Sequence, residues 1–475
     1  MRRLVFAILI CLTQYSLAAN NDLPSLGDAT SGLISIEKEH ELGRTWLRNL
    51  RQQAATLHDP VLTEYTENLI YRLAAHSQVN DRRFEIVLLD NKQLNAFAVP
   101  GGVIGINAGL FIHAQNEPQF AAVLAHELAH LSQRHFARQV EESRKQAPIA
   151  MATLLGSILL LASNNTEAGF AGLMTSQAAA TQWALSYSRD WEREADRLGM
   201  HTLVSAEIDP QGMPDMFSQM FEAHRYSQRP PEFLLTHPVT ENRISDAAAR
   251  VDNLNVTPIP EDLEYQLMRT RILVNYQQNS HNLPHYQKLF KTAKNKQQQQ
   301  VAQYGMALLL LEQKKYKQAL AQANALLLQD KSRISYQALH NEILFFAQSP
   351  ERALKKLKKL LELNPDNHPL TMTYANLLLE NKQFSEAASE LQKHVNIRPN
   401  DPHLWQRLSE AQGKSGNQVG MFRSRAEFLF LTGQKSKALK QLQTALKLAG
   451  EHYLLAARIE QRAREMDNAN ESLEF

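Results

Sequence analysis

The alternation of apolar and polar positions divides the chain into four segments. Residues 1–18 combine a basic start with an apolar run and a small-residue end, which is typical of a cleaved secretory signal peptide. Residues 19–255 mix helical and strand periodicities, whereas residues 256–295 are polar and contain prolines. Residues 296–475 follow a helical pattern almost throughout. We expect an α+β domain, a helical connector and an all-α domain behind the signal; an uncleaved membrane anchor is the alternative for the first segment.

The all-α segment contains an internal repeat. Ala319, Ala353 and Ala387 recur at intervals of 34 residues, and prolines close two of the units. This period with a small residue at a fixed place is typical of tetratricopeptide repeats, which stack into a solenoid with a concave face for a partner. Ala438 lies one and a half periods beyond Ala387, so we expect the register to break near residues 413–420. We predict about four repeats; a generic helical bundle is the alternative.

Composition narrows the chemistry that the chain can perform. The net charge of the 475 residues is +2, so a nucleic acid is not an expected partner. Cys11 is the only cysteine and lies within the signal segment, and the bulky Ile10 before it argues against a lipoprotein. After cleavage no thiol remains, so a metal would be held by His, Glu or Asp.

One helix-like stretch carries a metal-binding pattern. Residues 120–139 are rich in Ala and Leu without Gly or Pro, and so predict a single helix. Four residues turn the helix by about 400°, so His126 and His130 share a face and can ligate one metal. Glu127 lies beside them, where it can take a proton from an activated water. His135 lies about 180° away from His126 on such a helix, so we do not count it as a ligand.

A second helix-like stretch supplies a third ligand. In residues 186–200, Glu192 and Asp196 are four positions apart and share a face. Glu192 would complete a His₂Glu site for one zinc ion per chain, and Asp196 would hold the free nitrogen of a ligating histidine. A surface helix of ion pairs is the alternative for this stretch.

Four motifs in this order resemble the gluzincin metallopeptidases, the family of the heat-shock protease HtpX and the CaaX prenyl endopeptidases. They are NAFAVPGG (95–102), HELAH (126–130), EREAD (192–196) and LLTHPVTENR (234–243). The resemblance implies a zincin-like zinc endopeptidase domain over residues 19–255, with the ligands His126, His130 and Glu192 and the base Glu127. The signal segment and the repeats point to the soluble periplasmic members of the family.

The resemblance also implies that His237 lies close to the zinc. It would either stabilise an oxyanion or take the fourth coordination position and keep the resting enzyme latent, and we favour latency. For Arg243 we expect contact with a substrate carbonyl or a nearby carboxylate, or a structural role.

Phe84–Leu89 predict a strand and Asn95–Phe97 an edge segment, where an extended substrate would pair through its main chain. A plain turn into a packed strand is the alternative for the edge segment.

The interval between the two ligand-bearing stretches contains no charge in residues 146–166 or in residues 168–188. Its dense apolar part is short for a hydrocarbon core of about 30 Å. We predict a helical hairpin packed over the cleft, with residues 148–163 touching the membrane surface peripherally. A hairpin that spans the membrane is the alternative.

The resemblance to the periplasmic members of the family implies a periplasmic zinc-dependent endopeptidase with chaperone-like activity, which acts in quality control and assembly of outer-membrane β-barrel proteins. Its partners would be unfolded or misassembled outer-membrane proteins and, through the repeats, the outer-membrane assembly machinery. The alternative is a catalytically latent binding or chaperone protein of the envelope with a structural zinc site.

Overall fold

The computed structural model describes residues 35–142, 155–156, 158–159, 188–225, 231–254, 262–276, 282–347 and 350–469. The predicted signal peptide, residues 1–18, lies outside these ranges, and so does the predicted hairpin over 146–188 except for five positions. Within the described ranges, no helix combines the length and the apolar character needed to cross a lipid bilayer.

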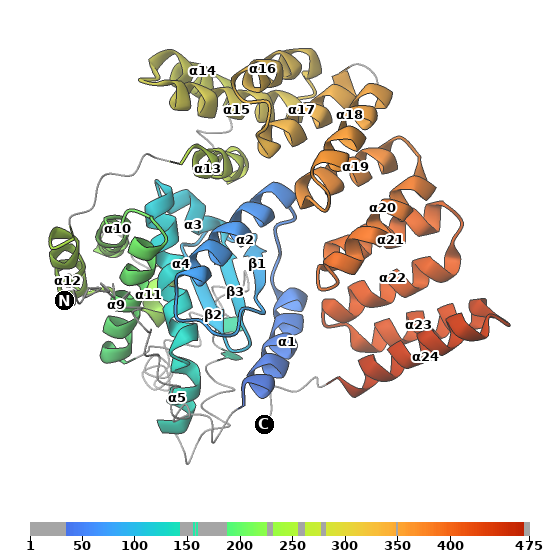
Figure 1. Ribbon diagram of the computed structural model, residues 1–475, viewed down its shortest axis with the longest axis horizontal. Coiled ribbons are helices and arrows are strands. Elements are labelled where there is room, and N and C mark those ends of the chain that lie inside the picture. The colour runs from blue at the N-terminus through green and yellow to red at the C-terminus, as the bar shows by residue number, and fades with distance from the viewer. Residues whose placement is uncertain are drawn as a thin grey trace, which may run out of the picture.

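A small mixed sheet lies at the centre of the N-terminal domain (Figure 1). Strand β1 (Glu85–Leu89) runs parallel to β3 (Val103–Asn107), and β2 (Ala96–Val99) runs antiparallel to β3, in the order β1-β3-β2. The predicted strand is confirmed to within one residue. The predicted edge segment overlaps β2, an outer strand of the sheet whose four residues are all buried.

The turn between β2 and β3 depends on glycine. Gly101 and Gly102 have φ values of +77° and +75°, which L side chains rarely adopt. A Cβ on Gly101 would also lie 2.5 Å from the carbonyl oxygen of Glu39 on α1. The two glycines therefore let the hairpin turn tightly and let α1 approach it.

The helices of this domain lie around the sheet (Figure 1). They are α1 (Ile36–Gln53), α2 (Pro60–Ala75), α3 (Ala108–His113), α4 (Glu117–Ser132), α5 (His135–Glu142), α9 (Arg189–Ser205), α10 (Gly212–Arg225), α11 (Phe233–Thr236) and α12 (Glu241–Asp252). The central one is α4, which is buried from Phe120 to His130 and packs against α2, α9, α10 and β2. The predicted helix over 120–139 is wrong in one respect: it ends at Ser132, and Arg134 turns the chain with a φ of +48° before α5.

Three buried residues of the uncharged interval fall within the described ranges. Leu155, Ile158 and Leu159 belong to a hydrophobic cluster that also contains Trp46 of α1 and Phe97 of β2. The indole N–H of Trp46 donates a hydrogen bond of 2.9 Å to the carbonyl oxygen of Leu155. These three residues are therefore packed against protein.

The C-terminal part is a solenoid of helices (Figure 1). Its helices are α13 (Leu263–Tyr276), α14 (Leu283–Thr292), α15 (Lys296–Glu312), α16 (Tyr316–Gln329), α17 (Ile334–Ala347), α18 (Pro350–Leu363), α19 (His368–Glu380), α20 (Phe384–Ile397), α21 (Pro402–Lys414), α22 (Gln418–Leu431), α23 (Lys435–Ala449) and α24 (Tyr453–Asn468). The four alanines of the repeat are fully buried, as close packing of antiparallel helices requires: Ala319, Ala353, Ala387 and Ala438.

The break in the repeat register has a structural counterpart around α22. Gly416 and Gly433 have φ values of +84° and +74°, and they form the turns on either side of this helix. The two turns are half a period apart, so α22 packs as a hairpin partner against both α21 and α23. The expected change of register therefore occurs at α22, which α21 and α23 share as a packing partner.

The solenoid curves around the N-terminal domain (Figure 1). Helix α13 packs against α2 and α3, α19 packs against α2, and α22 approaches α1. Two ion pairs connect the halves: Arg271 with Asp59 at 2.5 Å, and Arg398 with Glu67. The repeats therefore lie along α1 and α2, and β1 faces them.

Candidate active site

The structure brings all seven candidate site residues into one buried cluster. They come from α4 (His126, Glu127, His130), from α9 (Glu192, Asp196), from the end of α11 (His237) and from α12 (Arg243). None of these residues is more than 9% exposed. The helix pair α4–α9 and the α11–α12 segment therefore build the site together.

The three predicted ligands are spaced as one metal ion requires. The Nε2 atoms of His126 and His130 are 3.0 Å apart. The carboxylate of Glu192 lies 3.5 Å from Nε2 of His126 and 3.4 Å from Nε2 of His130. Ligand bonds of about 2.0–2.1 Å in a tetrahedral site place neighbouring ligand atoms roughly 3.3 Å apart. The donor set and its spacing therefore fit a single divalent cation.

His237 provides a fourth donor to the same cluster. Its Nδ1 lies 2.9 Å from Oε1 of Glu192 and 3.4 Å from Nε2 of His126. One ligand atom from each of these four residues lies within 4.8 Å of the others. The imidazole thus faces the same cluster as the three predicted ligands, and its Nε2 lies 3.4 Å from Oε1 of Glu127.

Asp196 and Arg243 hold the ligands from behind. Asp196 Oδ1 lies 3.0 Å from Nδ1 of His126, so that Nε2 is directed to the metal position. Arg243 donates two hydrogen bonds of 2.7 Å to Asp196 and lies 2.7 Å from Oε2 of Glu192. It also donates to the carbonyl oxygen of Pro238, directly after His237. Arg243 therefore contacts the carboxylates around the metal position and the histidine loop.

The carboxylates and the imidazoles of the cluster shift one another's pKa values. Burial alone would raise the pKa of Glu192, but His237 and Arg243 hold this pKa well below its ordinary value. Burial alone would lower the pKa of His126, but the carboxylates of Asp196 and Glu192 raise it to about 9. The carboxylates thus compensate positive charge at the position that the imidazoles face.

Glu127 stands between the metal position and the sheet. It is 1% exposed, and burial raises the pKa of its carboxyl group against the opposing effect of His237. The backbone of Ala98 on β2 faces the carboxyl group and also opposes the rise of its pKa. A carboxylate with a raised pKa is suited to accept a proton near neutral pH and to return it.

His135 is a member of the site that the sequence reasoning missed. Because the chain turns at Arg134, the His135 ring faces back toward α4, and its Nδ1 lies 2.8 Å from Nδ1 of His130. Its Nε2 lies 3.1 Å from Glu194, which also pairs with Arg138. His135 therefore orients His130 from behind, as Asp196 orients His126. The position of His135 shortly after the HELAH motif was a signal in the sequence. On a continuous helix, however, its side chain would point away from the metal-facing side.

Removing the Arg243 guanidinium should destabilise the fold. In Arg243→Met, Glu192 and Asp196 keep their charges in a buried place without their shared cation. We expect the free energy of unfolding to fall by about 3–5 kcal/mol, measured by urea denaturation. The control is Arg193→Met on α9, whose pair with Asp190 is exposed and should change the value by about 0.5 kcal/mol or less. Equal losses in the two variants would contradict the assigned contacts.

Comparison with known proteins adds an independent observation. Residues 60–251 match the Peptidase family M48, and residues 345–411 match a Tetratricopeptide repeat family. The Beta-barrel assembly-enhancing protease of Yersinia pestis is 33% identical over 97% of this chain and 94% of its own length. The protein of the same name from Escherichia coli (strain K12) is 34% identical over 89% of this chain and 86% of its own length. The Mitochondrial metalloendopeptidase OMA1 of Schizosaccharomyces pombe is 29% identical over 38% of this chain and 51% of its own length.

Proposed function

Since the chain belongs to the family of the β-barrel assembly-enhancing proteases, metalloendopeptidases with a family M48 domain and tetratricopeptide repeats, we propose that it is a periplasmic zinc endopeptidase. Its substrates are unfolded or misassembled outer-membrane β-barrel proteins. The observation that carries the proposal is the buried convergence of His126, His130 and Glu192 beside Glu127.

The proposed mechanism assigns a task to each side chain. His126, His130 and Glu192 hold zinc, which when bound supplies the positive charge that activates a water and polarises the scissile carbonyl. Glu127 takes the proton of the attacking water and gives it to the leaving amine. An extended substrate lies along β2, whose Ala98 backbone faces Glu127, so the scissile bond is held by main-chain contacts that require little sequence preference.

His237 makes the resting enzyme latent in this proposal. Its Nδ1 stands where water or a substrate oxygen would have to bind, 3.4 Å from Nε2 of His126. The loop is held by Arg243 through Pro238, and the peptide N–H of Phe233 donates to the carbonyl oxygen of Leu94 just before β2. Displacement of this loop therefore opens the fourth coordination position and the start of the edge strand at the same time.

The same contact favours a second candidate, a latent binding or chaperone protein with a structural zinc site. In such a protein His237 would stay a permanent fourth ligand, as closed structural zinc sites require. We favour the protease because Glu127 remains beside the cluster, where a structural site has no need of a buried carboxyl. Chaperone-like activity toward the same clients accompanies proteolysis in our proposal, and the repeats recruit the outer-membrane assembly machinery.

A cleavage assay with two states of one substrate tests the proposal. The zinc-loaded protein is incubated with an outer-membrane β-barrel protein diluted from urea, and with the same protein folded in detergent. We expect cleavage of the unfolded form only, its loss with a zinc chelator, and its return on adding zinc. Cleavage of both forms at one rate would contradict the selection of unfolded clients. Absence of cleavage of either form, also with the His237 side chain removed, would contradict the endopeptidase.

A further inference from the structure

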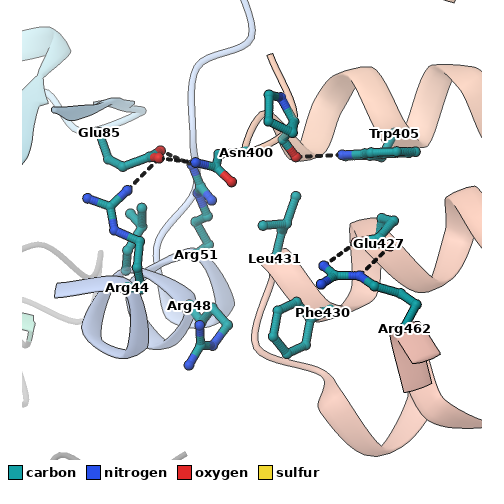
Figure 2. Close-up of a pocket in the computed structure, with 12 residues that line it drawn as sticks. Arg44, Arg48, Arg51, Glu85, Asn400, Trp405, Glu427, Phe430, Leu431 and Arg462 are labelled. Carbon is teal, nitrogen blue, oxygen red and sulfur yellow. Dashed lines mark hydrogen bonds and ion pairs between the residues drawn. The ribbon is translucent and has the colours of Figure 1, made fainter. Parts of the chain in front are cut away.

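A cavity lies between the two domains (Figure 2), and none of the predicted zinc ligands lines it. Its volume is about 470 Å³. Helix α1 and the first residue of β1 form one wall, and helices α21, α22 and α24 form the other. β1 is the outer strand opposite to β2, so the cavity and the catalytic cluster lie at different edges of the sheet.

The lining of the cavity has an excess of positive charge. Its four guanidinium groups, those of Arg44, Arg48, Arg51 and Arg462, face two carboxylates, those of Glu85 and Glu427. Glu427 accepts two hydrogen bonds of 2.8 Å from Arg462 and is thereby neutralised. Glu85 pairs with Arg44 and lies 3.7 Å from Arg51. Among the described residues that line the cavity, two carboxylates thus accompany four guanidinium groups.

Two arginines of α1, Arg44 and Arg51, line the cavity and are largely buried. The Arg51 side chain is 8% exposed, and burial lowers its pKa to about 10, with Asp401 opposing this effect and Arg48 adding to it. Burial and the neighbouring Arg51 and Arg83 also lower the pKa of Arg44 to about 10. The Nε of Arg44 is buried and makes no hydrogen bond within the described part of the chain. An anionic group in the cavity would relieve this repulsion.

The opposite wall is aromatic and aliphatic. The Phe430 ring has the Arg48 guanidinium 5.0 Å and the Arg462 guanidinium 5.6 Å from its centroid. Leu431 stands between the two walls, and Trp405 presents its ring because its N–H is bonded to the carbonyl oxygen of Pro399 (Figure 2). A fitting ligand therefore carries an anion beside an apolar group.

A neighbouring cavity shows where the rest of such a ligand would lie. It has a volume of about 310 Å³, and Arg51, Glu85 and Asn400 line both cavities. It continues along β1 past Ile86 to Leu88. This outer strand pairs with residues 55–57 only near its end, through Leu88 and Asp90. An extended chain can therefore follow β1 toward the arginines.

We propose that the arginine cavity binds the free C-terminal carboxylate of an extended polypeptide whose last side chain is apolar. Arg48 and Arg51 bind the carboxylate, and Phe430, Leu431 and Trp405 enclose the last side chain. The inference rests on the proposed function, since an unfolded client offers such a terminus, and it makes the cavity between the domains a second contact with the client, apart from the scissile bond.

The test measures binding of a labelled peptide of alternating polar and apolar residues that ends in phenylalanine. It uses the full chain with Glu127→Gln, so that cleavage does not consume the probe, and reads fluorescence anisotropy. We expect the peptide with a free carboxylate to bind roughly 10- to 100-fold more tightly than its C-terminal amide, because the amide lacks the charge that the guanidinium groups bind. Adding Arg48→Gln should reduce this difference between acid and amide, because Arg51 alone then binds the carboxylate.

The matched control is Arg464→Gln, which lies on the same helix as Arg462, is 69% exposed and does not line the cavity. It should keep the full preference for the free acid. The proposal would be overturned if the acid and the amide bound equally tightly. It would also be overturned if an amidated peptide with an internal glutamate bound as tightly as the free acid. An unchanged preference in Arg48→Gln would contradict it as well. Cleavage of the unfolded β-barrel protein is measured separately with the parent enzyme. The peptide-binding results therefore do not decide whether the protein is an endopeptidase, which the cleavage assay tests.

Discussion

Replacing Glu127 with Gln is expected to slow cleavage of an unfolded β-barrel substrate by about 100- to 10,000-fold, the usual contribution of a general base. The amide keeps the shape of the side chain but cannot take a proton from water. Because Glu127 is not one of the ligands, the zinc content should stay at the wild-type value. Initial cleavage rates and elemental analysis of the same preparations check both expectations.

Glu222→Gln on the exposed side of α10 is the control for this variant and should cleave at the wild-type rate. If Glu127→Gln retained the parent rate, proton transfer by this residue would be excluded. If it lost the metal as well, Glu127 would belong to the ligand set and not to the proton pathway.

Replacing His237 with Ala is expected to raise cleavage of the same substrate by roughly tenfold or more. The reason is that the ring of the resting protein faces the cluster of the three ligands. A competing conformation that is populated to a few per cent or less becomes dominant once the favoured one is removed. Cleavage rates per bound zinc are the measurement, so that any change in metal content is accounted for.

His201→Ala, on the exposed face of α9, is the matched control and should leave the rate unchanged. A complete loss of cleavage in His237→Ala, with the metal still bound, would show the opposite role. The imidazole would then stabilise the developing oxyanion, and the resting state would not be latent.

The ligand helices could be predicted because their signals are local. His126 and His130 are four residues apart, and Glu192 and Asp196 have the same spacing, which fixes a shared face without any tertiary information. The motif EREAD contains a second glutamate, Glu194, and only the family resemblance favours Glu192 as the ligand. In the structure these two residues point to different sides of α9: Glu192 toward His126, and Glu194 toward His135.

The end of α4 could not be predicted from the same kind of reasoning. The stretch contains no Gly or Pro, and the left-handed turn is made by Arg134, a residue that seldom adopts a positive φ. Its Nη2 and Nε lie 3.1 and 3.3 Å from Glu39 of α1, which is distant in sequence. The role of His135 follows from this turn, so it was hidden for the same reason.

The way in which the repeats pack against the N-terminal domain could not be predicted from the sequence either. Helical periodicity predicts which residues of a repeat are buried, and the four alanines are placed as expected. The contacts between domains are of another kind, since Arg271 meets Asp59 and Arg398 meets Glu67 across more than two hundred residues. No spacing rule relates such pairs, and the cavity of arginines exists only because these surfaces meet.

An anomalous difference map, recorded at the zinc absorption edge from crystals of the purified protein, examines the ligand set most directly. We predict one strong peak, bounded by Nε2 of His126, Nε2 of His130 and the carboxylate of Glu192. A map without a peak between the two imidazoles, or with Glu192 turned away from it, would contradict the assignment of a zinc peptidase.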